Sequence, residues 1–471
     1  METPSPARLT TTRGAALYIG ALVGPALLLL PGLAAAEAGP ASVLAWAGLL
    51  ALSALFAVVF GALGRGFGSA SGVIGYVRAG LGSRASAVAG WSFLAGVVVG
   101  APVFCLIGAG YVTGLTGGGP LARALIGTLL LAAVLALAAG GLRTSATAQL
   151  LLVALLVAVV AVAVAGSVRA DHAANWTPFA PHGWQAVGHA ASTLLLSFVG
   201  WEAAAPLTTR FADPGRQLPR VIGIALTVTT VLYLGLAVAT IGALGTGAGT
   251  SAPLAALLRD AAGPAGTAAA AVAAVVLTLG SVNAYVTGAA EMTRALTQPT
   301  ASDRAGTAAG ERPAPRFIAA VAVTGLAEIA AYGAGVVSPA ALVALPAALF
   351  LVVYLGSMAS AVRVLRGPAR LAAAPATVLV AVVLAYCGWA VLAPLAVALA
   401  VCAAGPLTAG ARSARQARSA RQARAAGQAR AARQARAAGQ APTAAATVAG
   451  QVPTAGDLGR AERPSSPAPA R

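Results

Sequence analysis

Two apolar segments of this sequence are interrupted near their midpoints by glycine and proline. The first break is Gly20-Ala21-Leu22-Val23-Gly24-Pro25-Ala26, and the second, in the sixth apolar segment, is Phe198-Val199-Gly200-Trp201-Glu202, followed by Pro206. In hydrocarbon, the N–H and C=O groups that a break frees are very costly unless they line a cavity or bind something. Corresponding breaks in the two halves of a chain therefore point to a transport site.

Pro25 suits the first residue of a second half-helix, because its missing N–H is no loss there and its fixed φ fits the helix. The N–H groups of Ala26 and Leu27 would then be free to face a substrate carboxylate at the positive end of the half-helix dipole. The alternative is a mere proline kink in a packed helix. The substrate contacts predicted in this segment are Gly20, Val23, Gly24, Ala26 and Leu27.

In the second break, main-chain carbonyls around Phe198, Val199 and Gly200 are predicted to accept hydrogen bonds from a substrate ammonium. Glu202 is the one carboxylate clearly at mid-span, and ionised groups in hydrocarbon are costly and usually functional. Two roles are open for it: carrying a coupled proton, or capping N–H groups that the break frees.

The composition requires a polytopic membrane protein. The chain has 471 residues, of which 59% are hydrophobic and 9% charged, whereas soluble domains carry about 25% charged residues. A span needs roughly 20 apolar residues, which predicts about twelve spans, or eleven if residues 372–409 do not form a hairpin at Gly388 to Pro394. The expected spans are 14–36, 41–63, 86–115, 121–140, 146–168, 187–208, 219–244, 265–290, 317–336, 339–361, 372–389 and 391–409.

The positive charge is all arginine, and its distribution predicts the orientation. With the amino terminus inside, the outer loops carry only Arg123, Arg169 and Arg259, and the other arginines are cytoplasmic. The positive-inside bias therefore favours an orientation in the cell membrane with both termini on the cytoplasmic side. The net charge of +18 follows from this bias and from the tail, so we expect the lipid bilayer, and no nucleic acid, as a partner.

The chain divides into a cytoplasmic amino terminus, a membrane region and a tail. Beyond residue 409 a six-residue unit rich in Ala, Arg and Gln recurs, with nothing apolar to pack it, so disorder is expected. The expected parts are 1–13 (amino terminus), 14–168 (spans 1–5), 187–361 (spans 6–10), 372–409 (two extra spans) and 410–471 (tail).

Several of these segments together resemble a known family. They are IGALVGPALLLLPGLAAAEAGPASVLAWAGLLAL (19–52), GRGFGSASGVIGYVRAGLG (64–82), FVGWEAAAPLTTRFADPGRQLPRVI (198–222) and NAYVTGAAEMTRAL (283–296). They are similar to signatures of the amino acid/polyamine/organocation permeases. Within that family, the VGWEA form resembles the bacterial exporters of methionine and branched-chain amino acids.

The resemblance implies an all-α membrane protein with a LeuT-like five-plus-five inverted repeat, discontinuous helices 1 and 6, and two extra spans. It places Trp201 as an aromatic gate or pocket wall, with ordinary packing as the alternative. Pro25 departs from the usual Gly-(Ser/Ala)-Gly pattern of the family, because proline cannot donate a hydrogen bond. Glu291 and Arg294, one turn apart, are expected to form an ion pair at the inner gate.

The coupling ion is left open between a proton and Na⁺, and no cofactor or metal site is predicted. Span 5 carries no charge, which excludes a lysine in place of the ion. Thr278 and Ser281 in span 8 are candidate Na⁺ ligands beside carbonyls of span 1, although such hydroxyls also bond their own helix. Glu328 is expected in a helix contact.

The pocket wall is expected from Gly96 to Pro102 (GVVVGAP), whose small apolar residues suit an aliphatic or thioether side chain. The sequence thus predicts a secondary active transporter for neutral, hydrophobic amino acids that works by alternating access with proton coupling or exchange. A polyamine or cationic amino acid antiporter and a non-transporting sensor that signals through the tail are alternatives, and a homodimer is left open. No enzyme is expected, because the chain lacks GxSxG, HExxH and P-loop motifs.

Overall fold

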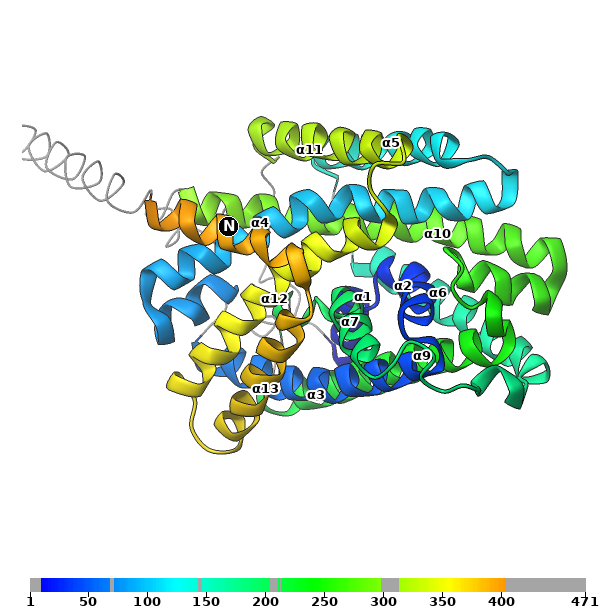
Figure 1. Ribbon diagram of the computed structural model, residues 1–471. Coiled ribbons are helices and arrows are strands. Elements are labelled where there is room, and N and C mark those ends of the chain that lie inside the picture. The colour runs from blue at the N-terminus through cyan, green and yellow to red at the C-terminus, as the bar shows by residue number, and fades with distance from the viewer. Residues whose placement is uncertain are drawn as a thin grey trace, which may run out of the picture. The chain divides into compact units, whose positions relative to one another are not determined.

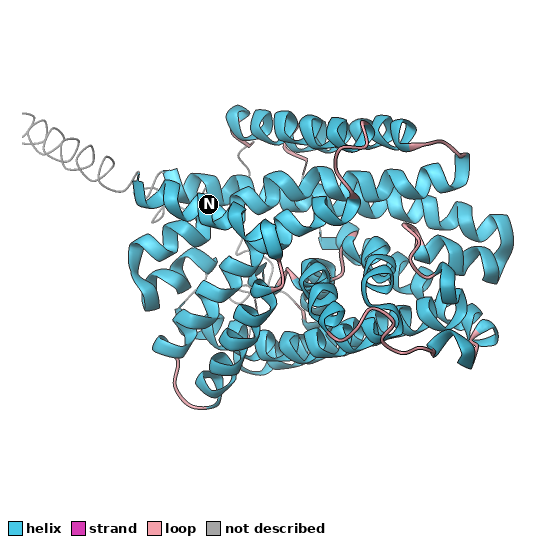
Figure 2. Ribbon diagram, in the orientation of Figure 1, coloured by secondary structure: helices cyan, strands magenta, loops and turns pink. Residues whose placement is uncertain are grey.

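The computed structural model describes residues 10–67, 72–142, 146–203, 211, 213–297 and 313–403. The expected tail, 410–471, and most of the amino terminus lie outside these residues. Within them the chain forms helices joined by loops, with no β-strand (Figure 2). The α-helices are α1 (Thr11–Leu22), α2 (Ala26–Ala38), α3 (Ser42–Phe67), α4 (Gly72–Thr116), α5 (Pro120–Ala139), α6 (Ala146–Ser167), α7 (Gln185–Leu194), α9 (Pro214–Leu244), α10 (Pro253–Thr297), α11 (Pro315–Gly333), α12 (Pro339–Val364) and α13 (Pro368–Ala385).

The first expected span is two helices rather than one. α1 ends at Leu22, Val23 leaves the helical region with φ −96° and ψ 87°, and α2 begins after Pro25. Pro25 itself has φ −58° and ψ −19°, as the first residue before a new helix should. The discontinuity predicted for helix 1 is therefore present.

The sixth expected span is also discontinuous. α7 passes into a 3-10 helix, η4 (Leu195–Phe198), and a second short turn, η5 (Trp201–Ala203), follows the break. Between them Val199 is extended, with φ −73° and ψ 129°, and Gly200 has φ +144°. Only glycine adopts that φ at low cost, which explains why this position is not an ordinary apolar residue.

Two long helices bend where glycine takes a positive φ. α4 is kinked at Gly82 and α10 at Gly263, so each begins with a short helix before its membrane span. The first of these lies between the expected spans 41–63 and 86–115. It is bound to the end of α12, since Ser360 Oγ donates to Tyr76 O at 2.5 Å and Arg363 Nη1 donates to Gly80 O at 3.2 Å.

The described residues contain nine stretches of helix long and apolar enough to cross a membrane. The expected number is larger for identifiable reasons. The stretch Ala26–Phe67 runs through two expected spans, the broken sixth span is divided into short pieces, and the apolar helix Gly388–Ala403 is below span length within the described part. The chain turns between α13 and this last helix at Tyr386 to Gly388, so the region holds two helices.

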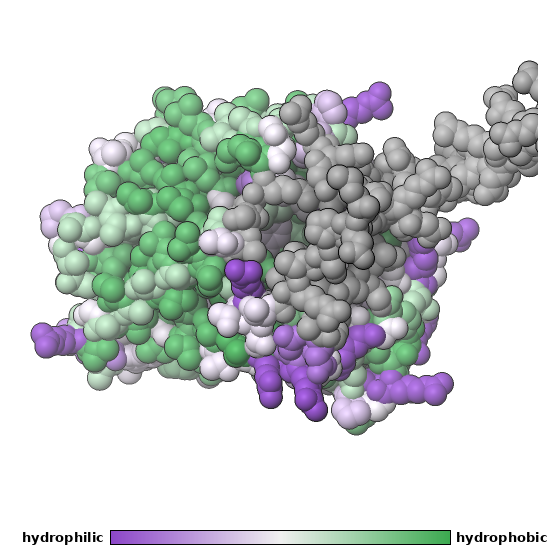
Figure 3. All heavy atoms as spheres, turned by 180° about the vertical axis from the view of Figure 1, so that it is seen from behind, coloured by the Kyte–Doolittle hydropathy of each residue, from purple (hydrophilic) through white to green (hydrophobic). Residues whose placement is uncertain are grey.

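The broken helices lie inside the bundle. In Figure 1, α1, α2 and α7 are surrounded by the longer helices, whereas α5 and α11 lie side by side at one edge. The outward faces are apolar: Leu129 and Val323 are both 69% exposed. Figure 3 shows a broad apolar face with hydrophilic residues at its margins. Such a surface is stable only against lipid, so this is a multi-pass membrane protein.

Candidate functional site

The two breaks meet in direct main-chain contact. A Cβ on Gly200 would lie 2.3 Å from the Ala21 carbonyl oxygen and 3.1 Å from the Leu22 nitrogen. No side chain fits into such a gap, so the absence of one at residue 200 lets the sixth span approach the end of α1. The sequence predicted both breaks, and the tertiary structure brings them together.

At the first break, some main-chain groups are paired and others are not. The Val23 N–H donates to Ile19 O at 2.7 Å, and the Leu27 N–H donates to Gly24 O at 3.2 Å. The prediction of a free N–H at Leu27 is therefore wrong, because the chain closes a tight turn across Pro25. Among the described residues, the N–H groups of Gly24 and Ala26 have no hydrogen-bond partner.

Space lies open beside these unpaired groups. A Cβ added at Gly24 would meet no atom within 4 Å, and Gly24 is half-buried whereas its neighbours Val23 and Pro25 are buried. Gly24 thus offers a main-chain donor beside open space, and the second unpaired donor, at the buried Ala26, follows two residues later. An anion such as a carboxylate is the kind of group that unpaired N–H donors at a helix start bind.

Gly20 faces a polar side chain that the sequence analysis missed. A Cβ there would lie 2.0 Å from Nε2 of Gln149, so the amide of Gln149 in α6 lies against α1. Span 5 carries no charge, as predicted, yet it supplies an amide next to the break. The signal was a lone glutamine in an otherwise apolar run.

At the second break, Glu202 and Tyr354 bind the freed N–H groups. The Gly200 N–H donates to Glu202 Oε2 at 2.9 Å and to the Tyr354 hydroxyl at 3.0 Å, and the Trp201 N–H donates to the same hydroxyl at 3.2 Å. The Tyr354 hydroxyl also makes a short hydrogen bond to Glu202 Oε2. Both side chains are buried. Glu202 thus caps an N–H group that the break frees, which is one of the two roles that the sequence left open for it.

Tyrosine hydroxyls satisfy the freed carbonyls. The Tyr233 hydroxyl lies 2.8 Å from Leu22 O and 2.6 Å from Ser197 O, and its hydrogen is shared between them. One hydroxyl thus bridges the ends of both broken spans. Tyr285 donates to Val199 O at 3.4 Å, whereas the Tyr354 hydroxyl lies 3.3 Å from Phe198 O with its single hydrogen directed to Glu202. Both carbonyls are predicted to receive a substrate ammonium; that of Val199 already accepts one bond, and that of Phe198 has only the longer contact with Tyr354. A carbonyl has two lone pairs, so each retains at least one.

Trp201 is packed inside the protein. It is 1% exposed, its Nε1 donates to Ser53 Oγ on α3 at 2.7 Å, and its ring meets Tyr18 edge-on at 6.5 Å between centroids. A buried indole N–H that finds a hydroxyl partner is the usual arrangement for tryptophan in a core. Trp201 therefore closes the space between α1 and α3 beside the break.

Both span-8 hydroxyls named as candidate Na⁺ ligands, those of Thr278 and Ser281, are buried. Thr278 faces α4, because a Cβ on Gly108 would lie 2.6 Å from its Oγ1. Thr278 remains a candidate Na⁺ ligand, because its buried Oγ1 has no hydrogen-bond partner among the described residues and so does not bond its own helix. Ser281 is buried in α10. Glu291 is exposed near the end of the helix, and the side chain of Arg294 lies outside the described residues.

The expected pocket wall in span 3 packs against α12 instead. A Cβ on Gly96 would lie 3.1 Å from the Phe350 ring, and one on Gly100 would lie 3.4 Å from Pro346. These glycines allow close helix packing and do not line an opening. Glu328 lies on the peripheral helix α11, where its Oε2 has no hydrogen-bond partner among the described residues.

Comparisons with known proteins agree on one class. The family model described as amino acid permease matches residues 9–409. The chain is 32% identical over 399 residues to the uncharacterized amino acid permease YecA of Bacillus subtilis (strain 168), across 83% of this chain and 94% of the relative. It is 35% identical over 236 residues to the L-methionine/branched-chain amino acid exporter YjeH of Escherichia coli (strain K12), across 49% of this chain and 55% of that one.

A solved structure shares the fold. The crystal structure of MhsT in complex with L-phenylalanine superposes with a TM-score of 0.55 at 14% sequence identity, across 84% of this chain and 100% of that chain. At this identity the likeness concerns the fold alone. It agrees with the LeuT-like arrangement and the broken helices described above.

Proposed function

The chain belongs to the amino acid permease family, and we propose that it moves neutral, hydrophobic amino acids across the cytoplasmic membrane by alternating access. The resemblance found in the sequence is thereby confirmed. Proteins of this family are amino acid transporters and not enzymes. The family is established by these comparisons. Our proposal concerns the substrate class, the mechanism, the coupling and the membrane in which the protein works.

The observation that carries the proposal is the pair of unpaired donors at the first break. The N–H groups of Gly24 and Ala26 lack partners among the described residues, and open space lies beside Gly24. A substrate carboxylate would satisfy them, and the remaining lone pairs of the span-6 carbonyls would receive its ammonium. The α-amino acid moiety is then held by main-chain groups, as the sequence predicts.

The surroundings of the breaks favour a neutral substrate side chain. Glu202 is the acidic residue at the site, and its carboxylate already binds the Gly200 N–H and the Tyr354 hydroxyl. A cationic side chain would have to break these bonds, and an anionic one would meet Glu202 itself. A polyamine or cationic amino acid antiporter is disfavoured for this reason. The relative YjeH, named as an exporter of methionine and branched-chain amino acids, supports the same class and the direction of export.

For the coupling we propose proton coupling or amino acid exchange in preference to sodium. Of the two candidate Na⁺ ligands in span 8, Thr278 faces Gly108 of α4 and Ser281 is buried in α10. Proton movement through Glu202 would require opening its bonds to Gly200 and Tyr354.

The test is transport by the full-length protein in liposomes. We expect leucine, isoleucine, valine and methionine to be taken up or exchanged, and arginine, glutamate and putrescine to be excluded, under an imposed pH gradient or with internal amino acid. Uptake that requires Na⁺ would overturn the coupling, and uptake of arginine or putrescine would overturn the substrate class. If no amino acid moves under any gradient, the sensor alternative gains support, and removal of residues 411–471 should then abolish signalling.

A further inference from the structure

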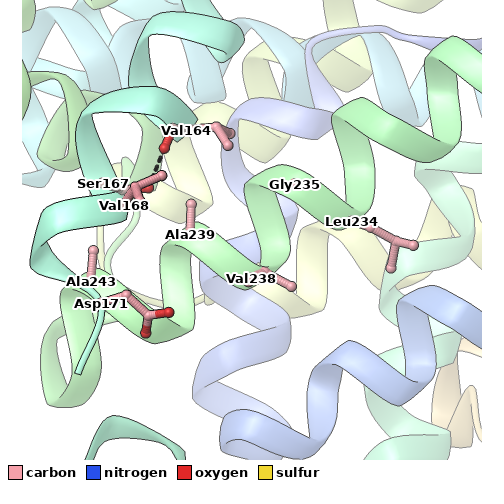
Figure 4. A pocket seen from close by; sticks show the side chains of 9 residues that line it. All are labelled: Val164, Ser167, Val168, Asp171, Leu234, Gly235, Val238, Ala239 and Ala243. Carbon is pink, nitrogen blue, oxygen red and sulfur yellow. Dashed lines mark hydrogen bonds between the residues drawn. The ribbon is translucent and has the colours of Figure 1, made fainter. Parts of the chain in front are cut away.

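An apolar groove lies on the membrane-facing side of the bundle, away from the breaks. It runs between α6 and α9 and has a volume of about 320 Å³. Figure 4 shows α9 side chains along one wall and the end of α6 on the other. The groove is lined by Val164, Ser167, Val168, Asp171, Leu234, Gly235, Val238, Ala239 and Ala243.

Small residues on α9 create this groove. Gly235, Ala239 and Ala243 follow one another at intervals of four residues, on one face of the helix. A Cβ on Gly235 would make only ordinary contact with Val164, at 3.6 Å, so the helices do not need the glycine to pack. Val168 and Val238 at its rim are 70% and 39% exposed. In a membrane this surface faces lipid, and an acyl chain is the occupant that the bilayer supplies.

One end of the groove carries a carboxylate in a fixed position. Asp171 follows the 3-10 turn η2 (Val168–Ala170), and its Oδ1 accepts a hydrogen bond from Trp176 Nε1 at 3.2 Å. It rests on α9, because a Cβ on Gly242 would lie 2.3 Å from the same oxygen. Among the described residues it forms no salt bridge. The charge is thus held at the groove with one oxygen available.

The hydrogen-bond partner of Asp171 indicates that this carboxylate lies at the depth of the lipid headgroups. Trp176, its hydrogen-bond partner, is a residue type that concentrates at the membrane interface. Arg169, two residues before Asp171, is exposed at the same end of α6. An acidic residue thus lines the apolar groove, and an exposed basic residue precedes it by two positions in the chain. The two charged groups of a zwitterionic phospholipid, phosphate and ammonium, are complementary to them.

We propose that this groove binds phosphatidylethanolamine, with an acyl chain between α6 and α9, the ammonium on Asp171 and the phosphate near Arg169. A primary ammonium suits the site because its N–H groups can donate to the free oxygen of Asp171. A choline headgroup has no such donor, and a phosphatidylglycerol headgroup brings no positive charge. The site is distinct from the breaks and does not depend on the proposed transport function.

Native mass spectrometry of the full-length protein with an equimolar mixture of phosphatidylethanolamine, phosphatidylcholine and phosphatidylglycerol of the same chains tests the headgroup. We expect phosphatidylethanolamine to be retained preferentially, and Asp171→Asn to lower that preference about two- to fivefold, as for an exposed charge pair. Asp260→Asn is the matched control: Asp260 also stands beside an arginine, Arg259, at 3.7 Å, and does not line the groove.

A second experiment locates the bound chain. Phosphatidylethanolamine with a photoreactive acyl chain should label peptides from 164–171 and 234–243, and Gly235→Leu, which fills the groove, should remove that label. No headgroup preference in the wild-type protein, or an equal effect of Asp171→Asn and Asp260→Asn, overturns the proposal. Labelling that persists in Gly235→Leu at the wild-type level also overturns it. Asp171 is at the surface, so its substitution leaves folding intact even if Gly235→Leu does not.

Discussion

Gly200 in the sixth span lies against the main chain of Ala21 in the first, so closely that a Cβ would be 2.3 Å from the Ala21 carbonyl oxygen. The contact joins the two helix breaks without a side chain between them. Its neighbours bind the groups that the breaks free: Tyr233 holds carbonyls from both spans, while Glu202 and Tyr354 hold N–H groups of the sixth. What is left unpaired, at Gly24 and Ala26, lies on the first span.

Gly200→Ala should destabilise the protein and abolish transport. The φ of +144° is unfavourable for alanine, at a cost of about 1–3 kcal/mol, and the added methyl group would also collide with Ala21. Thermal unfolding in detergent measures the loss. Gly183→Ala is the control, since Gly183 also has a positive φ, +77°, but faces open space. Equal losses in the two variants would mean that the contact with Ala21 has no effect of its own.

Gly24→Leu should abolish uptake while leaving insertion and unfolding temperature near the wild-type values. Residue 24 has open space around a Cβ, so the leucine fills the opening in front of the Gly24 and Ala26 N–H groups without straining the fold. The measurement is uptake by reconstituted protein together with its unfolding temperature. Gly48→Leu is the matched control, because Gly48 in α3 is exposed and equally open. Normal uptake by Gly24→Leu would remove this opening from the transport site.

Glu202→Gln should fold and exchange substrate almost as the wild type does, whereas Glu202→Ala should be less stable. The glutamine carbonyl can still accept the Gly200 N–H, but alanine leaves a buried donor with one partner fewer, at a cost of about 1–3 kcal/mol. Comparing pH-driven uptake with exchange in Glu202→Gln separates the two roles. Loss of pH-driven uptake alone would assign proton coupling to Glu202, and loss of exchange at normal stability would contradict a purely capping role.

Tyr233→Phe should lower the free energy of unfolding by about 1–3 kcal/mol, because buried carbonyls of Leu22 and Ser197 lose their shared donor. Chemical or thermal denaturation of the purified protein measures this. Tyr332→Phe is the control: the ring that lies under Arg123 is kept, and only the hydroxyl of a half-buried tyrosine is removed. If both variants unfold like the wild type, the bridge between the breaks does not contribute to stability.

The sequence by itself determined that the chain spans a membrane many times, which family it resembles and where helices 1 and 6 break. These are local properties: apolar length sets a span, and glycine with proline interrupts it. The unpaired N–H at Ala26 follows from the same residues. Even Glu202 could be singled out, because a carboxylate within a span is rare.

Only the tertiary structure decided which side chains bind the freed groups and which way each helix faces. Tyr354 and Tyr233 contact the breaks from distant parts of the chain, so no local pattern reveals them. Thr278 faces α4 and Gly96 faces α12, and the sequence did not reveal these directions. In a membrane the outer surface is as apolar as the interior, so hydropathy does not mark the inward face, and helix rotation is set by close packing between partners.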